Sequence, residues 1–442
     1  MGLRNCEIMF DNPYNTYYSG QTIKGVVNVS FDSTKKIRGI SIKLKGEAKT
    51  KWTERQQKQQ FGHTAGSNNH HSGQNNYEYI NVDFTGSEEY FKFQYYLLGA
   101  KKGDKLEIPP GKYSYPFSCK LPESLPSSFE GKYGHIRYTA KVTLDRPWKF
   151  DQEYKTAFTV ISTVDLNLNP QVKIPIDVSV DKTFGCSCFG WCCDTGSMVI
   201  TGSLPYTGFV SGQEIPLSLK FDNDSNVELQ SINIELKKNI LFHSQYPSRE
   251  TKKFDEIVWR RIIKPNDGLH SNTICQPIMI PALPPSNLYH CSIIGLNYTI
   301  KIQVKFMGSH TGKTIKIPIV LGTIPLTSQI TMDAVNSKDS SIDNRQQQGA
   351  PAIGFIVTST EPTAPPGPAS SDTNFDSNTS PPPYHLLYPN MPVPTYTESE
   401  FKAETIQDEN DDNEHTQFGF SYFAPRYPVY NFALPSNVNQ RF

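Results

Sequence analysis

The residue types and spacings that could do chemistry lie mainly near the C-terminus. Residues 381–384 read Pro-Pro-Pro-Tyr, and residues 393–396, twelve positions later, read Val-Pro-Thr-Tyr. Proline holds φ near the polyproline II value, so such segments are already close to the shape in which peptide-binding grooves take them. WW domains bind Pro-Pro-x-Tyr peptides in this way, with a second pocket for the tyrosine. We therefore predict a first handle and a degenerate second handle for WW domains, made of Pro381, Pro382, Tyr384, Val393, Pro394 and Tyr396.

A third short signal lies upstream, at residues 362–365. These residues, Pro362, Thr363, Ala364 and Pro365, resemble the Pro-Thr/Ser-Ala-Pro motif that the UEV domain of ESCRT-I binds. The physical basis is again a pre-extended peptide in a groove. A chance match in a segment rich in Pro, Thr and Ala is the equal alternative. Pro425 and Tyr427 have Pro-x-Tyr spacing too, but without a preceding proline or valine, so we expect little binding there.

The cysteines carry a weaker signal. Cys186, Cys188, Cys192 and Cys193 cluster around two aromatic residues. Four thiolates can hold zinc, but the Cys-x-Cys and Cys-Cys spacings strain a single tetrahedral site. S-acylation is a second alternative, and a loop of reduced thiols is the favoured interpretation.

No enzyme template fits the sequence. Residues 308–314 nearly spell a phosphate loop but are one residue short, and residues 315–320 after them read as a strand, where the loop needs a helix. We predict a hairpin turn there. The nucleophile-elbow and His-Glu-x-x-His motifs are absent from the sequence. We therefore expect a non-enzymatic protein without a cofactor or a bound metal.

Length and composition narrow the class of protein further. The 442 residues suit two domains and an additional segment, and a formal net charge of zero argues against nucleic acid as a partner. The N-terminus lacks an apolar signal segment, and the longest apolar run, residues 317–326, spans ten residues. A membrane-spanning helix needs about 18 or more. We expect a cytoplasmic protein with reduced thiols.

Strict alternation of apolar and polar residues predicts strands. It is clearest over residues 40–45, 137–144 and 298–306. A period of two is typical of half-buried antiparallel strands, and many such strands with Gly and Pro turns indicate sandwiches. Residues 56–76, rich in Gln, Asn, His, Gly and Ser, are predicted to be a flexible insert, and residues 331–442 a disordered Pro-rich tail.

The chain also repeats itself. Ser-Gly-Gln at residues 19–21 returns at residues 211–213, an offset of 192, and residues 37–45 match residues 229–237 at the same offset. Leu-Pro-Ser-Ser at residues 125–128 resembles Leu-Pro-Pro-Ser at residues 283–286. A repeat of this length is a duplicated domain. We predict an all-β fold of two tandem immunoglobulin-like sandwiches, residues 1–165 and 176–330, with a junction near residues 165–175.

These residues together resemble the arrestin-domain-containing proteins of the α-arrestin group. The likeness covers about three quarters of the chain and rests on the order and spacing of residues 111–117, 125–131, 136–138, 146–148, 165–167, 208–213, 283–286 and 317–326. It implies two arrestin-like sandwiches joined by a short hinge. The tail handles fit that group and not visual or β-arrestins.

The resemblance implies a trafficking adaptor. Such a protein would bind cytosolic segments of membrane receptors or transporters and recruit a HECT-type ubiquitin ligase through its WW domains. Ubiquitination, endocytosis and sorting would follow at the plasma membrane and endosomes, with ESCRT-I as a further partner and membrane association through cargo. The alternative is a structural scaffold subunit of an endosomal sorting coat, which would not need either tyrosine. A basic cluster at residues 35–38 could touch a phosphorylated cargo tail, although a solvated turn is the favoured interpretation.

Overall fold

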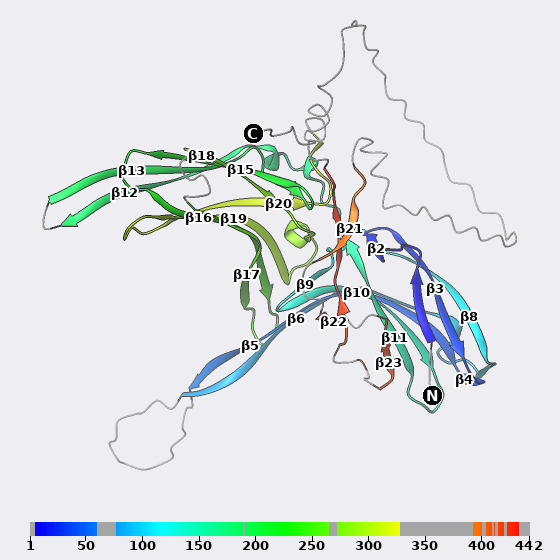
Figure 1. Cartoon of the computed structure of the whole chain (residues 1–442). Helices are drawn as coiled ribbons and strands as arrows, with labels where there is room; N and C mark the ends of the chain where they lie inside the picture. The colour runs from blue at the N-terminus through cyan, green and yellow to red at the C-terminus, as the bar shows by residue number, and fades with distance from the viewer. Residues whose placement is uncertain are drawn as a thin grey trace, which may run out of the picture.

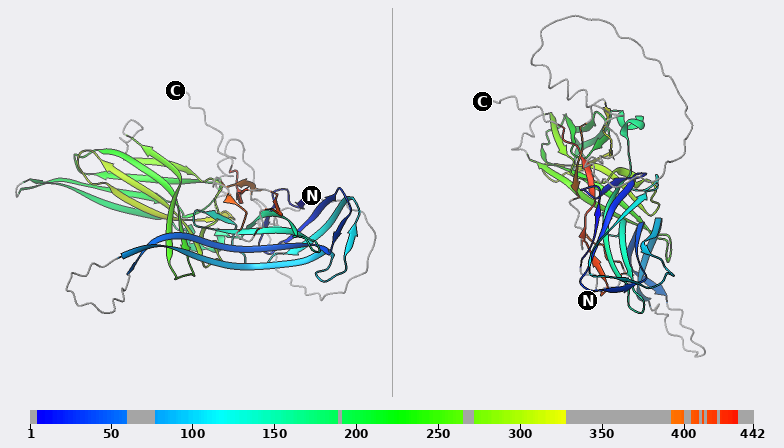
Figure 2. Two further views of the ribbon diagram at one scale, coloured as in Figure 1. Left: turned by 90° about the horizontal axis from the view of Figure 1, so that it is seen from below. Right: turned by 90° about the vertical axis from the view of Figure 1, so that its right-hand side faces the viewer.

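The computed structural model describes residues 5–59, 77–188, 191–264, 272–327, 392–399, 404–408, 411, 414–419 and 422–432. Over these residues the chain forms two β-sandwiches arranged end to end, with strands from the tail crossing the N-terminal one (Figures 1 and 2). The predicted all-β class with two tandem sandwiches is confirmed.

The N-terminal sandwich contains two main sheets. The first has the order β1-β3-β8, and the second has β2-β11-β10-β5-β6 with β9 beside β10. The small pair β4–β7 closes one end. The strands are β1 (Asn5–Phe10), β2 (Thr16–Tyr18), β3 (Thr22–Phe31), β4 (Lys35–Ile37), β5 (Gly39–Gln59), β6 (Tyr77–Gly99), β7 (Leu106–Ile108), β8 (Gly111–Lys120), β9 (Phe129–Gly131), β10 (Gly134–Asp145) and β11 (Gln152–Ile161).

The C-terminal sandwich follows two short 3₁₀ turns, η1 (Leu166–Leu168) and η2 (Pro170–Lys173). Its sheets have the orders β12-β13-β15-β18 and β14-β20-β19-β16-β17. The elements are β12 (Ile176–Cys188), β13 (Trp191–Leu204), β14 (Gly208–Val210), β15 (Glu214–Asn223), β16 (Leu229–His243), β17 (Thr251–Ile263), β18 (Thr273–Met279), η4 (Ser286–Leu288), β19 (Ile294–Phe306) and β20 (Lys313–Gly322).

The predicted alternation is confirmed. The apolar members of the three segments are buried, whereas the residues between them lie mainly at the sheet surface. Residues 307–312 connect β19 to β20, which pair antiparallel, as the hairpin interpretation of residues 308–314 requires. One boundary was wrong by four residues, because residues 56–59 of the predicted insert belong to β5, where they pair with β6.

The tail prediction also needs a correction. Part of residues 392–432 forms short strands, and several of its side chains are buried against the sandwiches. These strands are β21 (Thr395–Glu398), β22 (Glu404–Thr405), β23 (Thr416–Phe418), β24 (Tyr422–Phe423) and β25 (Arg426–Val429). Each has at most four residues, which is too short to show a period of two in the sequence.

The duplicated motifs have the same role in both sandwiches. The Tyr138 hydroxyl donates to the carbonyl oxygen of Pro126 over 2.6 Å, and the Tyr298 hydroxyl donates to that of Pro284 over 2.8 Å. Both tyrosines are fully buried, so each hydroxyl needs such a partner. The repeat therefore conserves a buried hydrogen bond that ties a loop to the middle of a sheet.

The repeated Ser-Gly-Gln segment makes a turn. Gly20 and Gly212 have φ of 81° and 86°, which glycine adopts without strain. After each glycine, a glutamine side chain accepts a hydrogen bond from the backbone of the preceding strand: Gln21 from Tyr18 and Gln213 from Val210. The turn therefore closes on itself in both domains.

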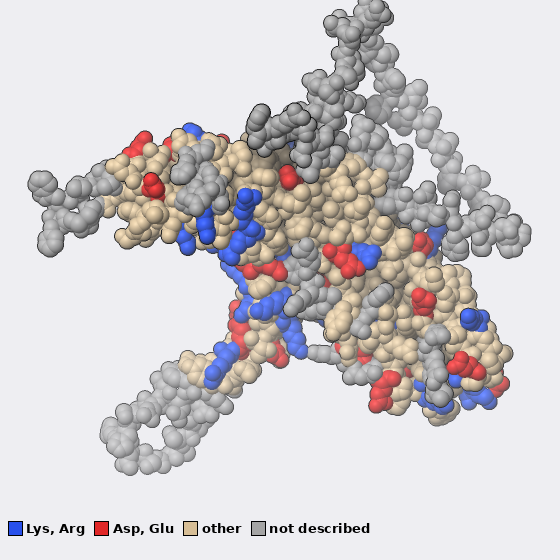
Figure 3. Space-filling model, viewed as in Figure 1, with Lys and Arg blue, Asp and Glu red and all other residues tan. Residues whose placement is uncertain are grey.

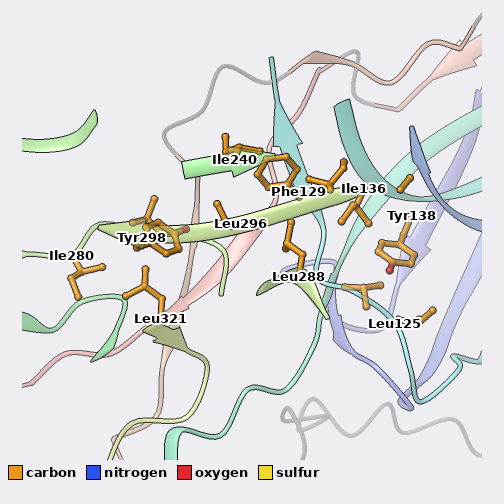
Figure 4. Close-up of a cluster of buried hydrophobic side chains, with 14 of the residues drawn as sticks. Leu125, Phe129, Ile136, Tyr138, Ile240, Ile280, Leu288, Leu296, Tyr298 and Leu321 are labelled. Carbon is orange, nitrogen blue, oxygen red and sulfur yellow. The ribbon is translucent and has the colours of Figure 1, made fainter. Parts of the chain in front are cut away.

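The hydrophobic core continues from one sandwich into the other. Figure 4 shows Phe129 and Ile136 of the N-terminal sandwich beside Ile240 and Leu296 of the C-terminal one. Phe129 also packs on Phe242, with ring centroids 6.4 Å apart. This shared apolar packing holds the domains against each other.

Candidate docking site where the tail meets the N-terminal sandwich

The described part of residues 392–432, here called the tail strap, lies across the N-terminal sandwich (Figure 1). β23 adds to the open edge of β11 in parallel, opposite residues 153–155. β21 and β25 pair with each other, as do β22 and β24. Edge strands present unpaired backbone groups, so a short segment can add there through main-chain hydrogen bonds.

The second handle is part of this strap. Tyr396 lies in β21, half-buried and opposite Pro428 of β25. Its ring centroid lies 5.4 Å from that of Tyr14, and its hydroxyl lies 3.3 Å from that of Tyr18. Burial is the main reason that the pKa of Tyr396 rises to about 12. Val393 is exposed, so the apolar start of the handle faces solvent while its tyrosine is covered.

Two tyrosines near the end of the strap anchor it to both sandwiches. Tyr427 and Tyr430 are only 1% and 0% exposed. The Tyr427 hydroxyl donates to the carbonyl of Ser128 over 2.9 Å, and the Tyr430 hydroxyl donates to that of Thr323 over 2.6 Å. A Cβ on Gly212 would lie 2.2 Å from the Tyr430 carbonyl oxygen, so only glycine permits this approach.

A row of lysines crosses the sheet that the strap covers. Lys43 on β5, Lys141 on β10 and Lys155 on β11 lie directly opposite one another in the strand register. Like charges opposite each other destabilise a sheet. Glu153 of β11 binds Lys141 over 2.7 Å and offsets part of this charge.

The strap supplies further carboxylates. Lys155 lies 2.7 Å from Asp408 and 2.7 Å from Asp411, and Lys49 lies 3.0 Å from Asp408. Lys155 and Asp411 side chains are each only 5% exposed, so screening by solvent is weak. Arg137 also donates to the backbone carbonyl of Thr405 over 2.8 Å.

The pKa values reflect this arrangement. Burial by itself raises the pKa of Asp408, but the hydrogen bonds and charges of Lys155 and Lys49 outweigh it and hold that pKa well below the usual range. Burial, followed by the charge of Lys141, lowers the pKa of Lys43. The tail carboxylate is therefore held in its charged form.

A cavity of about 540 Å³ lies at the junction of the domains and the strap. Thr50 and Tyr133 line it from the N-terminal sandwich, Tyr246 from the C-terminal one, and Gln407 and Asp408 from the strap. The strap therefore forms part of its wall. Figure 3 shows that Lys and Arg side chains gather nearby, around β17 and the adjoining part of β5 and β6.

Comparison with known proteins matches both sandwiches to family models. Residues 6–167 match the arrestin (or S-antigen) N-terminal domain, and residues 194–326 match the corresponding C-terminal domain. The chain belongs to the arrestin-domain family. Its relatives include arrestin domain-containing protein 17 of Caenorhabditis elegans, 32% identical over 96% of this chain and 98% of the relative. Arrestin domain-containing protein 4 of Mus musculus is 27% identical over 73% of this chain and 75% of the relative.

Several predicted site residues of this arrestin-domain protein lie outside the described residues. These are the first handle, residues 381–384, and the UEV-type motif, residues 362–365. The prediction of a cysteine loop was wrong, because Cys186 and Cys188 lie in β12, Cys192 and Cys193 lie in β13, and the two strands pair Cys186 with Cys193. Among the described residues, groups of His, Cys, Asp and Glu that could hold a metal ion are absent. Within the same residues, the search for a helix long and apolar enough to cross a membrane found none.

The sequence interpretation missed the strap contacts of this arrestin-domain protein. Residues 426–430 read Arg-Tyr-Pro-Val-Tyr, and aromatic and β-branched residues of this kind favour strands. Pro428 is accepted in β25 because that strand lies at a sheet edge, where proline costs no ladder hydrogen bond. Residues 408–414 form an acidic run within the segment that was predicted to be disordered. The lysine partners of Asp408 and Asp411 are 253 to 359 residues away, beyond the range of any local pattern.

Proposed function

We propose that this arrestin-domain protein is a non-enzymatic trafficking adaptor for membrane cargo. The two sandwiches, residues 1–165 and 176–330, hold a cytosolic segment of a membrane receptor or transporter. The tail recruits a HECT-type ubiquitin ligase through its WW domains. Membership of the arrestin-domain family supports the adaptor role, and the two Pro-x-Tyr handles in one tail support the ligase.

The outcome of this recruitment is ubiquitination of the cargo or of the adaptor, followed by endocytosis and endosomal sorting. The protein acts in the cytoplasm and is recruited to the plasma membrane and endosomes with its cargo. Pro362, Thr363, Ala364 and Pro365 give it a contact with ESCRT-I.

The observation that carries the proposal is the Pro-Pro-Pro-Tyr handle on a chain with two arrestin-type sandwiches. The test is co-purification of a WW-domain ligase with the full chain and with Tyr384→Ala/Tyr396→Ala. We expect the double variant to lose the ligase while both sandwiches stay folded. Tyr388→Ala is the matched control, because Tyr388 lies between the handles without the preceding prolines. Equal ligase recovery with the double variant favours the coat-scaffold alternative.

The two handles differ in access within this proposal. A WW domain takes its peptide as polyproline II, whereas Tyr396 is paired in β21 and packed on Tyr14. Binding to the second handle therefore requires β21 to leave the sandwich first, which lowers the apparent affinity.

A titration tests this difference in access. A WW domain should bind the Tyr384→Ala full chain about tenfold more weakly than a peptide of residues 387–400. In the full chain, Tyr14→Ala added to Tyr384→Ala should recover part of the loss, since it removes the ring that covers Tyr396. Equal affinity of peptide and chain would contradict occlusion of the second handle and leave the first handle unaffected.

A further inference from the structure

The connection between β10 and β11 carries the most exposed aromatic side chain of the described residues. Trp148 is 93% exposed and Phe150 is 72% exposed. Trp148 has φ of 63°, a left-handed conformation that a large side chain rarely adopts. The Arg146 guanidinium holds the turn by donating to the carbonyl of Phe150 over 2.9 Å. The fold therefore holds a tryptophan outward, where burial in the protein gives it no stabilisation.

Two further connections end beside this turn. Strands β10, β5 and β6 are neighbours, and the register places Asp145 opposite Gly39 and Gly39 opposite Gly99. The β6–β7 connection therefore leaves the sheet at the same end as the β10–β11 turn. The β4–β7 pair lies there as well, with Lys36 opposite Glu107. This end of the N-terminal sandwich is the one far from the C-terminal sandwich (Figure 1).

The three connections at this end of the sandwich carry a net positive charge. Residues 32–38, 100–107 and 145–151 contain eight Lys and Arg and five Asp and Glu. Two of the acidic groups are paired, Glu107 with Lys36 at 2.8 Å and Asp145 with Arg38 at 2.7 Å. Among the described residues, Lys101, Lys102, Lys105 and Lys149 have no carboxylate within ion-pair distance. Figure 3 shows basic side chains next to acidic ones at this end of the molecule.

We propose that this end of the N-terminal sandwich, here called the aromatic end, is a membrane-contact surface for anionic phospholipid. Trp148 and Phe150 enter the headgroup region, and the unpaired lysines attract the lipid charge. Tryptophan concentrates at membrane–water interfaces because its ring is apolar with one polar edge. Basic side chains close to such a surface add electrostatic attraction.

The shape of the aromatic end favours a bilayer over a folded protein partner. Trp148 stands on a protruding turn, and protein partners usually bury a central aromatic residue within a broad, closely packed patch. Among the described residues, the strap meets this turn through the His415 ring, 5.1 Å from that of Phe150, and Trp148 beside it stays exposed. The contact with lipid would be direct and would not depend on cargo or on either tail handle.

The test uses the purified full chain and vesicles of phosphatidylcholine with or without phosphatidylserine. We expect co-sedimentation with the phosphatidylserine vesicles that falls about tenfold in Trp148→Ala/Phe150→Ala. Leu168→Ala is the matched control, because Leu168 is 82% exposed on η1, away from the aromatic end. Subtraction of the fluorescence emission spectrum of Trp148→Phe from that of the natural chain isolates the emission of Trp148. This emission should shift to shorter wavelength when phosphatidylserine vesicles are added.

The outcomes separate insertion from general charge attraction. Lys101→Glu/Lys102→Glu should also weaken vesicle binding, and added salt should reduce it, because the surface attraction is screened. Full vesicle binding by the Trp148→Ala/Phe150→Ala variant, or unchanged Trp148 emission, overturns the proposal and leaves charge attraction alone. Failure of the natural chain to bind phosphatidylserine vesicles overturns it as well and leaves the exposed turn for a protein partner.

Discussion

The same sheet position carries opposite charge in the two sandwiches. The sequence offset of 192 pairs Lys43 of β5 with Glu235 of β16. The two residues also occupy equivalent places in their sheets, because Lys43 lies opposite Lys141 and Glu235 lies opposite Lys301. In the C-terminal sandwich Glu235 binds Arg260 over 2.5 Å within its own sheet. In the N-terminal sandwich Lys155 extends the row of Lys43 and Lys141. The carboxylates that bind Lys155 come from the strap, at Asp408 and Asp411.

The difference teaches how duplicated domains acquire different surfaces. The core positions stay apolar in both copies, whereas one outward-facing position decides whether the sheet neutralises itself or needs an external anion. A sheet of the first kind has no electrostatic reason to bind the tail. A sheet of the second kind is stabilised by an acidic segment, and here that segment belongs to the same strap as the second handle.

The largest effect on this comparison is expected from Glu235→Lys. It gives the C-terminal sandwich a lysine at the position equivalent to Lys43, but no acidic tail segment to neutralise it. Glu235 is buried, so Glu235→Lys puts a buried positive charge beside Arg260 and opposite Lys301, which costs about 3–5 kcal/mol. We expect a drop of that size in the free energy of unfolding, measured by denaturant titration. Glu214→Lys, an exposed change on β15, should leave it unchanged; equal losses in both variants would refute the comparison.

Removal of the carboxylates of the strap tests whether they stabilise the lysine row of the N-terminal sandwich. Asp408→Asn/Asp411→Asn leaves Lys155 buried without its two carboxylates, so strap closure should weaken by about 3 kcal/mol. Hydrogen exchange should then quicken at residues 416–418, which pair with β11. Asp222→Asn, at an exposed pair with Lys220, is the control. Unchanged protection in the double variant would mean that the tyrosine anchors alone hold the strap.

A second unlike pair is Gly46 and Lys238, which face Tyr138 and Tyr298 in the same register. A Cβ at Gly46 would lie 2.6 Å from the Tyr138 ring, whereas Lys238 is 0% exposed and its ammonium lies 5.5 Å from the Phe129 ring centroid. Burial lowers the pKa of Lys238 to about 8, despite Glu256 nearby.

The pH dependence of Lys238 follows from this shift. Between pH 8 and 10.5 the unfolded chain keeps a proton that the folded protein has lost, so this residue makes stability rise with pH over that window. Lys238→Met should stabilise most near pH 7, and its advantage should shrink by about 3 kcal/mol up to pH 10.5. The measurement is the free energy of unfolding of the natural chain and of Lys238→Met across this pH range. A difference between the two proteins that does not change with pH would show that Lys238 stays charged.

The smallest effect is expected for the buried tyrosine hydrogen bond that both sandwiches contain. Tyr138→Phe and Tyr298→Phe each remove one buried hydrogen bond to a loop carbonyl, and each should cost about 1–2 kcal/mol. Matching losses in thermal unfolding would show that the duplicated hydrogen bond contributes equally. A large loss for one tyrosine alone would place that bond among the features in which the copies diverged.

Much of the fold could be predicted because its signals are local or repeated. Alternation at residues 137–144 and 298–306 marks strands whose apolar side chains are buried. The repeated Ser-Gly-Gln and Leu-Pro segments mark equivalent turns and loops in both copies. The turn at residues 308–314 followed from the strand after it. Each of these rests on the chemistry of a few consecutive residues.

The candidate site was only half visible. The sequence showed Tyr396 as part of a handle, but it did not show that Tyr14 and Tyr18 cover it. Strands β21 to β25 are too short to have a periodicity, and their partners are far away along the chain. Pairing of that kind depends on which edge of a folded sheet stays open.

The sequence by itself determined the all-β class, the duplication, the handles and the lysines at alternate positions of β5 and β10. Side-chain period and proline stereochemistry act within a few residues, so they can be read directly from the chain. Only the tertiary structure decided that Lys43, Lys141 and Lys155 stand abreast and that Asp408 and Asp411 reach the last two of them. The reason is that the register of separate strands, and the contact of a distant tail with them, arise from packing across the whole domain.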